Sequence, residues 1–496
     1  MASTCSRATS AMSPAVAGLT VLCAGGMLQP SNMSLSPMSV ADALTIASDR
    51  VVHPRVRGGL KLALLLAALA LVAAACSSSP TMPAAKGTTS VPGHRPTTTT
   101  TTTVPAPSTS TVPPVATLEG GAVPLAPPTG PSVSPPASIT ADCSVDVTHT
   151  LHVWFKSLPA GSTVVMRPGA CYLVNGGIRL KNPQGLTIYG GTYRSSIALG
   201  QQTGATKVPA AFTLIGGSGD SLEEMQISGA NPGGYHASLA FAAGIDLEGT
   251  ANTTVRSVTI TNTFGDGITL SPLRGGANFN SGTIVAPSSN ITIRDVTVSG
   301  VGRQGLTFAS ASGAQVSDVI VKNPGQNTFD VEADQRNEGT SNLTINGCLA
   351  SGGVIFFANG GAGDAAETHD ITVENCTMLV PEGGSALFVK RAGGKGAHPM
   401  LRGPITFVSD SLQCGASVYT ACVQVTGGTV TVTGSRLQFP PGTVHEAVYG
   451  LSGGSHVEFT NDVVRGFGRT GHVSPSSSVR VDGGTWTPSG GSANKG

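Results

Sequence analysis

The stretch that decides the fold is Gly302–Asp334, which reads GRQGLTFASASGAQVSDVIVKNPGQNTFDVEAD. It contains three short apolar segments, LTF, VSDVIV and FDVE, which are separated by Gly, Asn and Ser residues. Leu306 and Phe329 are 23 residues apart, and the same interval separates Ile245 from Ile268 upstream. A repeat of this length, built of short strands and tight turns, predicts a coil of stacked turns.

The same pattern of apolar pairs around a polar break recurs along the chain. It is clearest in VRSVTITN from Val255, NITIRDVTVSG from Asn290, SNLTINGCLAS from Ser341 and HDITVENCTMLV from His369. If each turn pairs with the turns above and below it, parallel strands stack about 4.8 Å apart. This pattern resembles the right-handed parallel β-helix of the pectin-lyase-like superfamily, over roughly residues 144–487. We therefore predict an all-β, single-stranded solenoid, because the alternative, a β-sandwich, does not explain a constant strand pattern with loops of varying length.

Composition supports a β-rich chain and excludes one class of partner. Aromatic residues make up only 4% of the 496 residues, whereas there are 66 Gly and 33 Pro, which suits many tight turns and a low-complexity segment. The formal net charge is +1, so electrostatics indicate no nucleic-acid partner and no direct attraction to a membrane surface.

The first 76 residues predict export. Residues 1–50 show no sustained apolar period and are interpreted as a non-structural or mis-annotated leader, the alternative being a disordered cytoplasmic leader. Within residues 51–76, basic residues precede the apolar run LALLLAALALVAAA and then Cys76, as in a secretory signal. Fourteen apolar residues are short for a spanning helix, which needs about 20. The AAAC junction resembles the lipobox of bacterial lipoproteins, which implies acylation of Cys76 and anchoring of the exported chain to a membrane through the lipid. The alternative is an ordinary signal peptide, cut near Ala75, that leaves the chain secreted.

The rest of the chain divides by composition into a linker, a folded domain and a tail. Residues 77–140 are rich in Thr, Pro and Ser, which predicts a disordered, extended tether. We expect the β-helix to occupy residues 141–490 and a disordered tail to follow at 491–496.

Three pairs of cysteines are spaced for bonds within the coil. Cys414 and Cys422 flank a short loop, and Cys143 and Cys171 could join the N-terminal turns, so we predict these two pairs as disulfides. Cys348 and Cys376 occupy equivalent places in TINGC and TVENC, where stacked free thiols are favoured over a disulfide.

Stacking also brings charged side chains together. Aligning the turns on the apolar residues places one outward column at Asp246, Thr269, Thr307 and Asp330, a second at Glu248, Ser271, Ala309 and Glu332, and a third at Ala243, Asp266, Gln304 and Thr328. Arg303 should then share one open face with Asp266, Asp330 and Glu332, and Asp334 follows on the same strand. Gln304, Lys390 and Arg391 are candidate substrate-binding residues beside them. Asp246 and Glu248 are interpreted as solvated surface residues.

Two enzyme groups with this fold suggest chemistries. Asn262-Thr263 followed by Asp266 approximates the Asn-Thr-Asp motif of polygalacturonase-type hydrolases, but no Gly-His-Gly or Arg-x-Lys follows it along the chain. Pectate-lyase-type enzymes use acidic residues to hold calcium and an Arg or Lys as base, and Arg303 with Asp330 and Glu332 looks similar. The resemblance implies a lyase, hydrolase or epimerase of acidic glycan, with calcium as a possible cofactor. The alternative is a noncatalytic cell-surface protein that binds glycan or a neighbouring cell.

Overall fold

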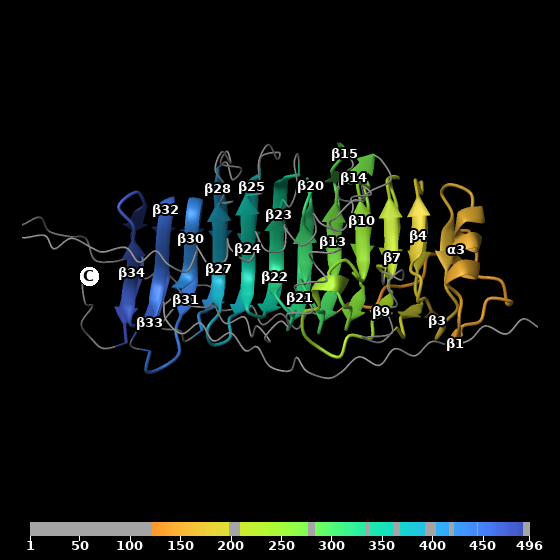
Figure 1. Ribbon diagram of the computed structural model, residues 1–496, viewed down its shortest axis with the longest axis horizontal. Helices are drawn as coiled ribbons and strands as arrows, with labels where there is room; N and C mark the ends of the chain where they lie inside the picture. Colours follow the sequence, from red (N-terminus) through yellow and green to blue (C-terminus); the bar gives the residue numbers. More distant parts are fainter. Residues whose placement is uncertain are drawn as a thin grey trace, which may run out of the picture. The chain divides into compact units, whose positions relative to one another are not determined.

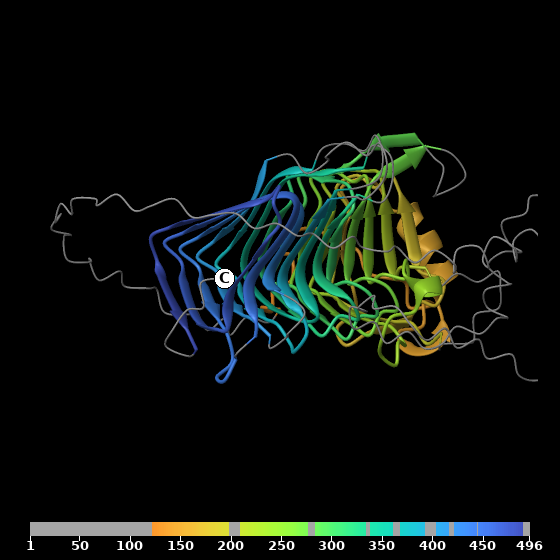
Figure 2. The same ribbon diagram turned by 60° about the vertical axis from the view of Figure 1, so that its left-hand side comes forward.

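The computed structural model describes residues 122–197, 209–275, 283–333, 338–360, 368–391, 403–415, 421–443 and 445–489. Within these ranges almost all regular structure is β-strand, and the strands form successive turns of a coil (Figures 1 and 2). Helix α3 (Thr148–Ser157) lies at the N-terminal end of the coil, and the short 3-10 helix η1 (Ala237–Leu239) lies in a turn. The predicted all-β solenoid is therefore confirmed.

The coil has three faces, and the first face carries the candidate site. Its strands run parallel, and each pairs with the strand of the next turn. In chain order they are β4 (Ile178–Lys181), β7 (Phe212–Ile215), β10 (Ile245–Glu248), β13 (Ile268–Ser271), β19 (Leu306–Phe308), β22 (Asn327–Glu332), β24 (Val354–Gly360), β27 (Ser385–Arg391), β30 (Ala421–Thr433), β32 (Ala447–Thr460) and β34 (Arg469–Val473).

The second and third faces are built in the same way. The second contains β2 (Thr163–Val165), β5 (Thr187–Tyr189), β8 (Ser221–Glu223), β11 (Thr254–Arg256), β17 (Thr292–Arg294), β25 (His369–Glu374), β28 (Pro404–Val408) and β35 (Ser478–Asp482). The third contains β3 (Cys171–Leu173), β6 (Thr192–Arg194), β9 (Gln226–Ser228), β12 (Thr259–Thr261), β18 (Thr297–Ser299), β26 (Thr377–Leu379), β29 (Ser411–Gln413), β31 (Arg436–Gln438), β33 (Val463–Phe467) and β36 (Thr485–Pro488).

Long strands and short strands complete the coil. β21 (Gln315–Lys322) and β23 (Thr340–Ser351) pass from the second face to the third, whereas β30 and β32 pass from the first to the second. The remaining strands are β1 (Asp142–Asp146), β16 (Ser288–Ser289), β20 (Ala311–Ser312) and an antiparallel pair outside the coil, β14 (Leu273–Gly275) and β15 (Thr283–Ala286).

The apolar repeat sets the register of the first face. Ile245 pairs with Ile268, Ile268 with Leu306, and Leu306 with Phe329, as the 23-residue interval predicts. All four side chains point inward and are fully buried. Burying one such side chain stabilises the fold by roughly 1.5–3 kcal/mol, and a slip of one residue would turn every one of them toward solvent. The register is therefore strongly specified.

The polar breaks between strands form the corners of the coil. Ser257, Asp295 and Asp318 adopt positive φ angles of 53°, 55° and 54° at the corner between the second and third faces. This left-handed conformation is open mainly to Gly, Asn and Asp, which explains why such residues punctuate the repeats. At another corner the Asn290 Nδ2 donates to the Asn252 Oδ1 of the preceding turn at 3.2 Å.

The packed chain begins before Ala141, the predicted start of the domain. Residues 122–140 belong to the predicted linker, yet backbone groups of Val123, Leu125 and Val133 hydrogen-bond to the coil. These contacts use main-chain groups, which a Pro-rich segment supplies even though it offers little apolar surface. The predictions for residues 1–50, 51–76, 77–121, 491–496 and for Cys76 fall outside the described ranges. Within those ranges, no helix is both long and apolar enough to cross a membrane.

Three disulfides join parts of the coil. Cys143 is bonded to Cys171, and Cys414 is bonded to Cys422, as the cysteine spacing suggested. Cys348 is bonded to Cys376, where we expected free thiols. Their Cα atoms are 4.4 Å apart, at the short end of the range that a disulfide can bridge, because the two residues stack directly on neighbouring turns.

Candidate functional site

The outward side chains of the first face form two columns along the coil. The longer, which we call the Asp330 column, contains Arg179, Thr213, Asp246, Thr269, Thr307, Asp330, Phe357, Phe388, Gln424, Gly450 and His472. Beside it, the Glu332 column contains Glu332, Lys390, Thr426 and Ser452, with the backbone of residue 359 between Glu332 and Lys390. Glu248 and Ser271 occupy the corresponding places nearer the N-terminus.

Arg303 draws together acidic side chains from different turns. Its Nη1 lies 3.4 Å from the Asp266 Oδ2, and its Nη2 lies 3.3 Å from the Glu332 Oε2. Arg303 and Asp266 lie in the turns that precede β19 and β13, whereas Asp330 and Glu332 belong to β22. We call these four residues the Arg303 cluster. The side chains of Arg303 and Glu332 are 13% and 20% exposed, so these two form the accessible edge of the cluster.

Asp266 is held by hydrogen bonds from its own turn and from the next. Its Oδ2 accepts from the Thr307 hydroxyl at 2.8 Å and from the Thr269 hydroxyl at 3.1 Å, while its Oδ1 accepts from the Gln304 backbone N–H at 3.1 Å. Burial raises the pKa of Asp266, and the charge of Arg303 and these hydrogen bonds oppose that rise. The carboxyl is therefore fixed in place and shifted toward its protonated form.

Asp330 is the most buried acid of the cluster. Its side chain is fully buried, its Oδ1 accepts from the Asn327 Nδ2 at 3.3 Å, and its Oδ2 has no hydrogen-bond partner among the described residues. Burial, first, and the charge of Glu332, second, raise the pKa of Asp330 well above its usual value, while Arg303 opposes the rise. A buried carboxyl beside a second carboxylate favours the protonated, neutral form.

The third predicted column needs two corrections. Gln304 was expected to contact substrate, but it is buried and its side-chain amide lies 2.8 Å from the Thr307 hydroxyl. It therefore supports Asp266 from within the wall. Thr328 was placed in this column, but it is buried, because the register assigns the position to Asn327, two residues before Phe329.

The remaining predicted residues lie along the same face. Lys390 is exposed and stands two turns beyond Glu332 in the Glu332 column, about 10 Å along the coil at the strand spacing. Arg391 is the last residue of β27, but its side chain and the whole of Asp334 fall outside what the structure describes.

A second acidic pair lies further along the face and was read from the sequence as solvated. The Arg179 Nη2 lies 3.2 Å from the Glu248 Oε1, and Asp246 accepts from the Ser271 hydroxyl at 2.9 Å. Burial and the neighbouring Glu248 raise the pKa of Asp246 to about 8. The sequence offered one signal for this pair, since Asp246-Leu-Glu248 repeats the Asp-x-Glu spacing of Asp330 and Glu332. Arg179 comes from two turns earlier, where the repeat length is irregular.

The acids of the Arg303 cluster do not fit a calcium site. Calcium takes six to eight oxygen ligands, most of them ionised or carbonyl groups. Here a guanidinium lies against Asp266 and Glu332, and the pKa of Asp330 is raised. Within the described ranges no group of three or more His, Cys, Asp or Glu side chains is arranged to hold a metal ion. We derive no step through calcium.

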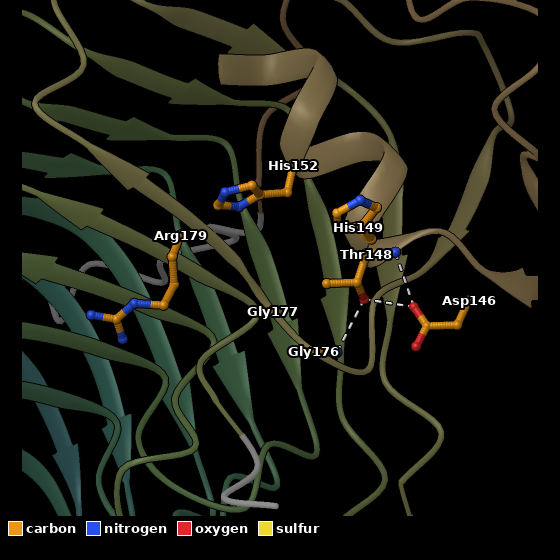
Figure 3. A pocket seen from close by; sticks show the side chains of 7 residues that line it. All are labelled: Asp146, Thr148, His149, His152, Gly176, Gly177 and Arg179. Carbon is orange, nitrogen blue, oxygen red and sulfur yellow. Dashed lines mark hydrogen bonds between the residues drawn. The ribbon is translucent and has the colours of Figure 1, made fainter. Parts of the chain in front are cut away.

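Two pockets lie near the ends of the Asp330 column. The first, of about 420 Å³, lies between helix α3 and the start of β4, and is lined by Asp146, Thr148, His149, His152, Gly176, Gly177 and Arg179 (Figure 3). Burial and the positive charge of Lys156 lower the pKa of His152 in this pocket. The second pocket, of about 230 Å³, lies toward the C-terminal end and includes Gln424, Arg469 and His472.

Comparison with known proteins supports the architecture. Residues 281–389 match the family model of the right handed beta helix region. The fold is a right-handed parallel β-helix. A search of curated proteins gave no significant match.

Solved structures are similar only at low sequence identity. The catalytic domain of Agl-KA is 12% identical, with a TM-score of 0.52 over 72% of this chain and 70% of that domain. A tailspike protein of the E. coli bacteriophage HK620, in complex with a pentasaccharide, is 13% identical, with a TM-score of 0.49 over 71% of this chain and 65% of its own. A GH87 alpha-1,3-glucanase from Streptomyces thermodiastaticus is 16% identical, with a TM-score of 0.43 over 74% and 70%. At these identities the likeness to Agl-KA shows the fold alone.

Proposed function

We propose that this chain is a polysaccharide-active protein that cleaves glycosidic bonds at the Arg303 cluster. One observation carries the proposal: a single guanidinium holds two carboxylates from different turns beside a third carboxyl whose pKa is raised. Grouped carboxyls with shifted pKa values at a surface are a frequent mark of a catalytic site. The Agl-KA catalytic domain shares the architecture, and the similar folds include an alpha-1,3-glucanase and a tailspike protein in complex with a pentasaccharide, which is in keeping with this function.

Glycoside hydrolysis needs a protonated carboxyl and a carboxylate on either side of the bond that breaks. The Asp266 Oδ2 and the Glu332 Oε2 contact the two terminal nitrogens of one guanidinium, which limits the distance between the two oxygens to about 9 Å. Hydrolases that invert the sugar place their carboxyls about 6.5–9.5 Å apart, and those that retain its configuration about 5–5.5 Å apart. Both separations lie within the limit.

The two carboxyls differ in the way that hydrolysis requires. The pKa of Asp266 is raised, so Asp266 is the candidate general acid that protonates the leaving oxygen. Glu332 is more exposed and is the candidate carboxylate that activates water or attacks the sugar. Arg303 orients both side chains, and the pKa shift of Asp330 keeps a further negative charge from building up behind them.

Charge on the first face favours a neutral glycan over the acidic glycan that the sequence suggested. Arg303 and Arg179, which could clamp a sugar carboxylate, already lie against Glu332 and Glu248. A glycan carboxylate would have to displace these contacts and approach the acids around them. Lyase and epimerase reactions on uronic acids remain the chemical alternatives, and they leave unsaturated or epimerised products.

A noncatalytic glycan-binding protein is the second candidate, and one observation favours it. Asp266 is only 2% exposed and Asp330 is fully buried, so a sugar reaches Glu332 and Arg303 more readily than the acids beneath them. In that reading the cluster anchors β22 against the turn that precedes β19, and glycan binds along the face without reaction.

The test is turnover by the full chain on neutral and acidic polysaccharides. Reducing ends report hydrolysis, absorbance of unsaturated sugars reports a lyase, and parallel reactions with calcium or a chelator test metal dependence. Glu332→Gln should lower turnover by about 10²–10⁴-fold, the range typical for losing an acid–base group. Asp482→Asn is the matched control, because Asp482 is an exposed carboxylate of β35, on the second face, that also lies against an Arg. Equal activity of wild type and Glu332→Gln would contradict the proposal.

We further propose that the chain is exported and meets its glycan at the cell envelope. The apolar run before Cys76 and the AAAC junction support lipid anchoring, and secretion is the alternative. Membrane contact would then come only through the lipid. Fractionation of cells that express wild type or Cys76→Ala separates the two, since a lipoprotein moves from the membrane to the soluble fraction when this cysteine is lost.

A further inference from the structure

The Asp330 column changes character at one point. Its next two members beyond Asp330 are Phe357 and Phe388, while all its other members are polar residues or Gly. The two ring centroids are 5.6 Å apart at an interplanar angle of 61°, and both side chains are only partly buried. Their neighbours in sequence, Phe356 and Leu387, point inward and are fully buried. The outward rings are therefore additional to the core.

The second pocket continues the same face. From Phe388 the column runs to Gln424, Gly450 and His472, and all three line the 230 Å³ pocket. Thr426 and Ser452, from the Glu332 column, line it too, and the Ser452 hydroxyl donates to the Thr426 Oγ1 at 3.2 Å. Acids, aromatic rings and a polar pocket thus follow one another on successive turns. Five register steps separate Asp330 from His472, about 24 Å at the strand spacing.

We propose that Phe357 and Phe388 form a stacking platform for the pyranose rings of a neutral glycan that lies along the coil axis, with the pocket around Gln424 and His472 as a distal subsite. This inference rests on the proposed function, because it takes the Arg303 cluster as the end of the groove where reaction occurs. The faces of aromatic rings carry negative partial charge, and the C–H faces of a sugar complement them. Sugar hydroxyls suit a pocket with few but convergent polar groups, such as this one.

Charge supports a neutral occupant for the platform. The acids of the Arg303 cluster lie at one end of it, so a polyuronate would place like charges against Glu332. Lys390 flanks the platform as an exposed cation. The Lys390→Ala variant therefore tests whether this face binds an acidic glycan instead. The competing explanation is structural: the two rings could simply pack on each other and stabilise the coil, since such a pair adds stability beyond the area that it buries.

Substitutions that remove the aromatic ring of Phe388 but keep an apolar side chain decide between these explanations. Phe388→Leu keeps an apolar side chain but removes the ring, and Phe388→Tyr keeps the ring. Val481→Ala is the control, since Val481 is an exposed apolar residue of β35, on the second face. Each substitution is made in the Glu332→Gln chain, so that binding is measured without turnover. The probes are gluco-, xylo- and manno-oligosaccharides of two to eight units, and oligogalacturonate and oligoalginate as acidic probes.

The expected result is a Kd for neutral oligosaccharides that falls with chain length until the chain spans the groove. Phe388→Leu should weaken binding at least tenfold with an unchanged Tm, whereas Phe388→Tyr and Val481→Ala should bind as the parent does. No binding of any neutral probe, equal binding by Phe388→Leu, or tighter binding of acidic probes that is lost in Lys390→Ala would overturn the inference. If binding depends on Phe388 but the wild-type chain, with Glu332 intact, shows no turnover, the proposed function is contradicted and the inference stands.

Discussion

Removal of the Arg303 guanidinium should leave a group of acids without their cation. Arg303 lies against Asp266 and Glu332 and is 13% exposed. Losing one partner of a buried ion pair costs about 3–5 kcal/mol, and losing an exposed one costs at most about 1 kcal/mol. Arg303→Ala is nearer the buried case, so we expect a loss of stability of about 2–4 kcal/mol at pH 8.

The loss in Arg303→Ala should depend on pH with a definite sign. Arg303 lowers the pKa of both Asp266 and Asp330, so its removal raises both pKa values further. A carboxyl whose folded pKa lies above its unfolded value of about 3.9 stabilises the fold fully below that pH, and this stabilisation is lost as pH rises toward the folded pKa. The difference between wild type and Arg303→Ala should therefore be small near pH 4 and grow toward pH 8.

Arg480 provides a matched control for this measurement. Its Nη1 lies 3.4 Å from Glu458 and its Nη2 3.2 Å from Asp482, so it also bridges two carboxylates, but its side chain is 62% exposed. Thermal melts followed by circular dichroism at pH 4, 6 and 8 compare the two Ala variants. Arg480→Ala should change Tm little at any of these values. Equal Tm losses for both variants, or an Arg303→Ala loss that shrinks as pH rises, would refute the electrostatic account of the cluster.

Three further results follow from the structure. Burial raises the pKa of Asp462 to about 7, so wild type should lose at most about 4 kcal/mol of stability between pH 4 and pH 7 as this carboxyl ionises. Asp462→Asn should not show this loss. Tm-against-pH curves that run parallel for the two proteins would contradict this. The disulfide between Cys348 and Cys376 closes 28 residues, so replacing both with Ala should cost roughly 3–4 kcal/mol, and an unchanged Tm under non-reducing conditions would contradict it. Turnover should lose the basic limb of its pH profile in Asp266→Asn, because Asp266 is the candidate general acid and its pKa is raised, and retention of that limb would assign it to another group.

The sequence predicted the coil in detail because one physical constraint dominates it. Four successive turns must bury Ile245, Ile268, Leu306 and Phe329 directly against one another, and only one register does so. The same register then determines which residues point outward. That is why Arg303 could be placed beside Asp266 and Glu332, which are 37 and 29 residues away along the chain.

The turns limited what the sequence could predict. The assignment of Thr328 to the third column was wrong, because the place two residues before the inward Phe329 belongs to Asn327. Contacts across two turns, such as Arg179 with Glu248, depend on side-chain reach, which no pattern of apolar residues encodes. The burial of Gln304 follows from hydrogen bonds inside the wall of the coil, which the sequence does not show.

The aromatic platform could have been predicted from the register alone. Phe357 follows Asp330 by one turn, and Phe388 follows Phe357 in the strand SALFVKR, but the varying loops obscured this alignment in the sequence. The disulfide at Cys348 was missed for another reason. Stacking sets the distance between the two sulfurs, but it does not determine whether they are oxidised.

The central claim is that the Arg303 cluster cleaves a neutral polysaccharide. The most direct measurement is product formation by the full chain and by Glu332→Gln on the same panel of neutral and acidic polysaccharides, with Asp482→Asn as control. The account predicts new reducing ends from a neutral glycan, no unsaturated product, no dependence on calcium, and loss of turnover only in Glu332→Gln. Unsaturated products from a polyuronate, or turnover that survives Glu332→Gln, would contradict it.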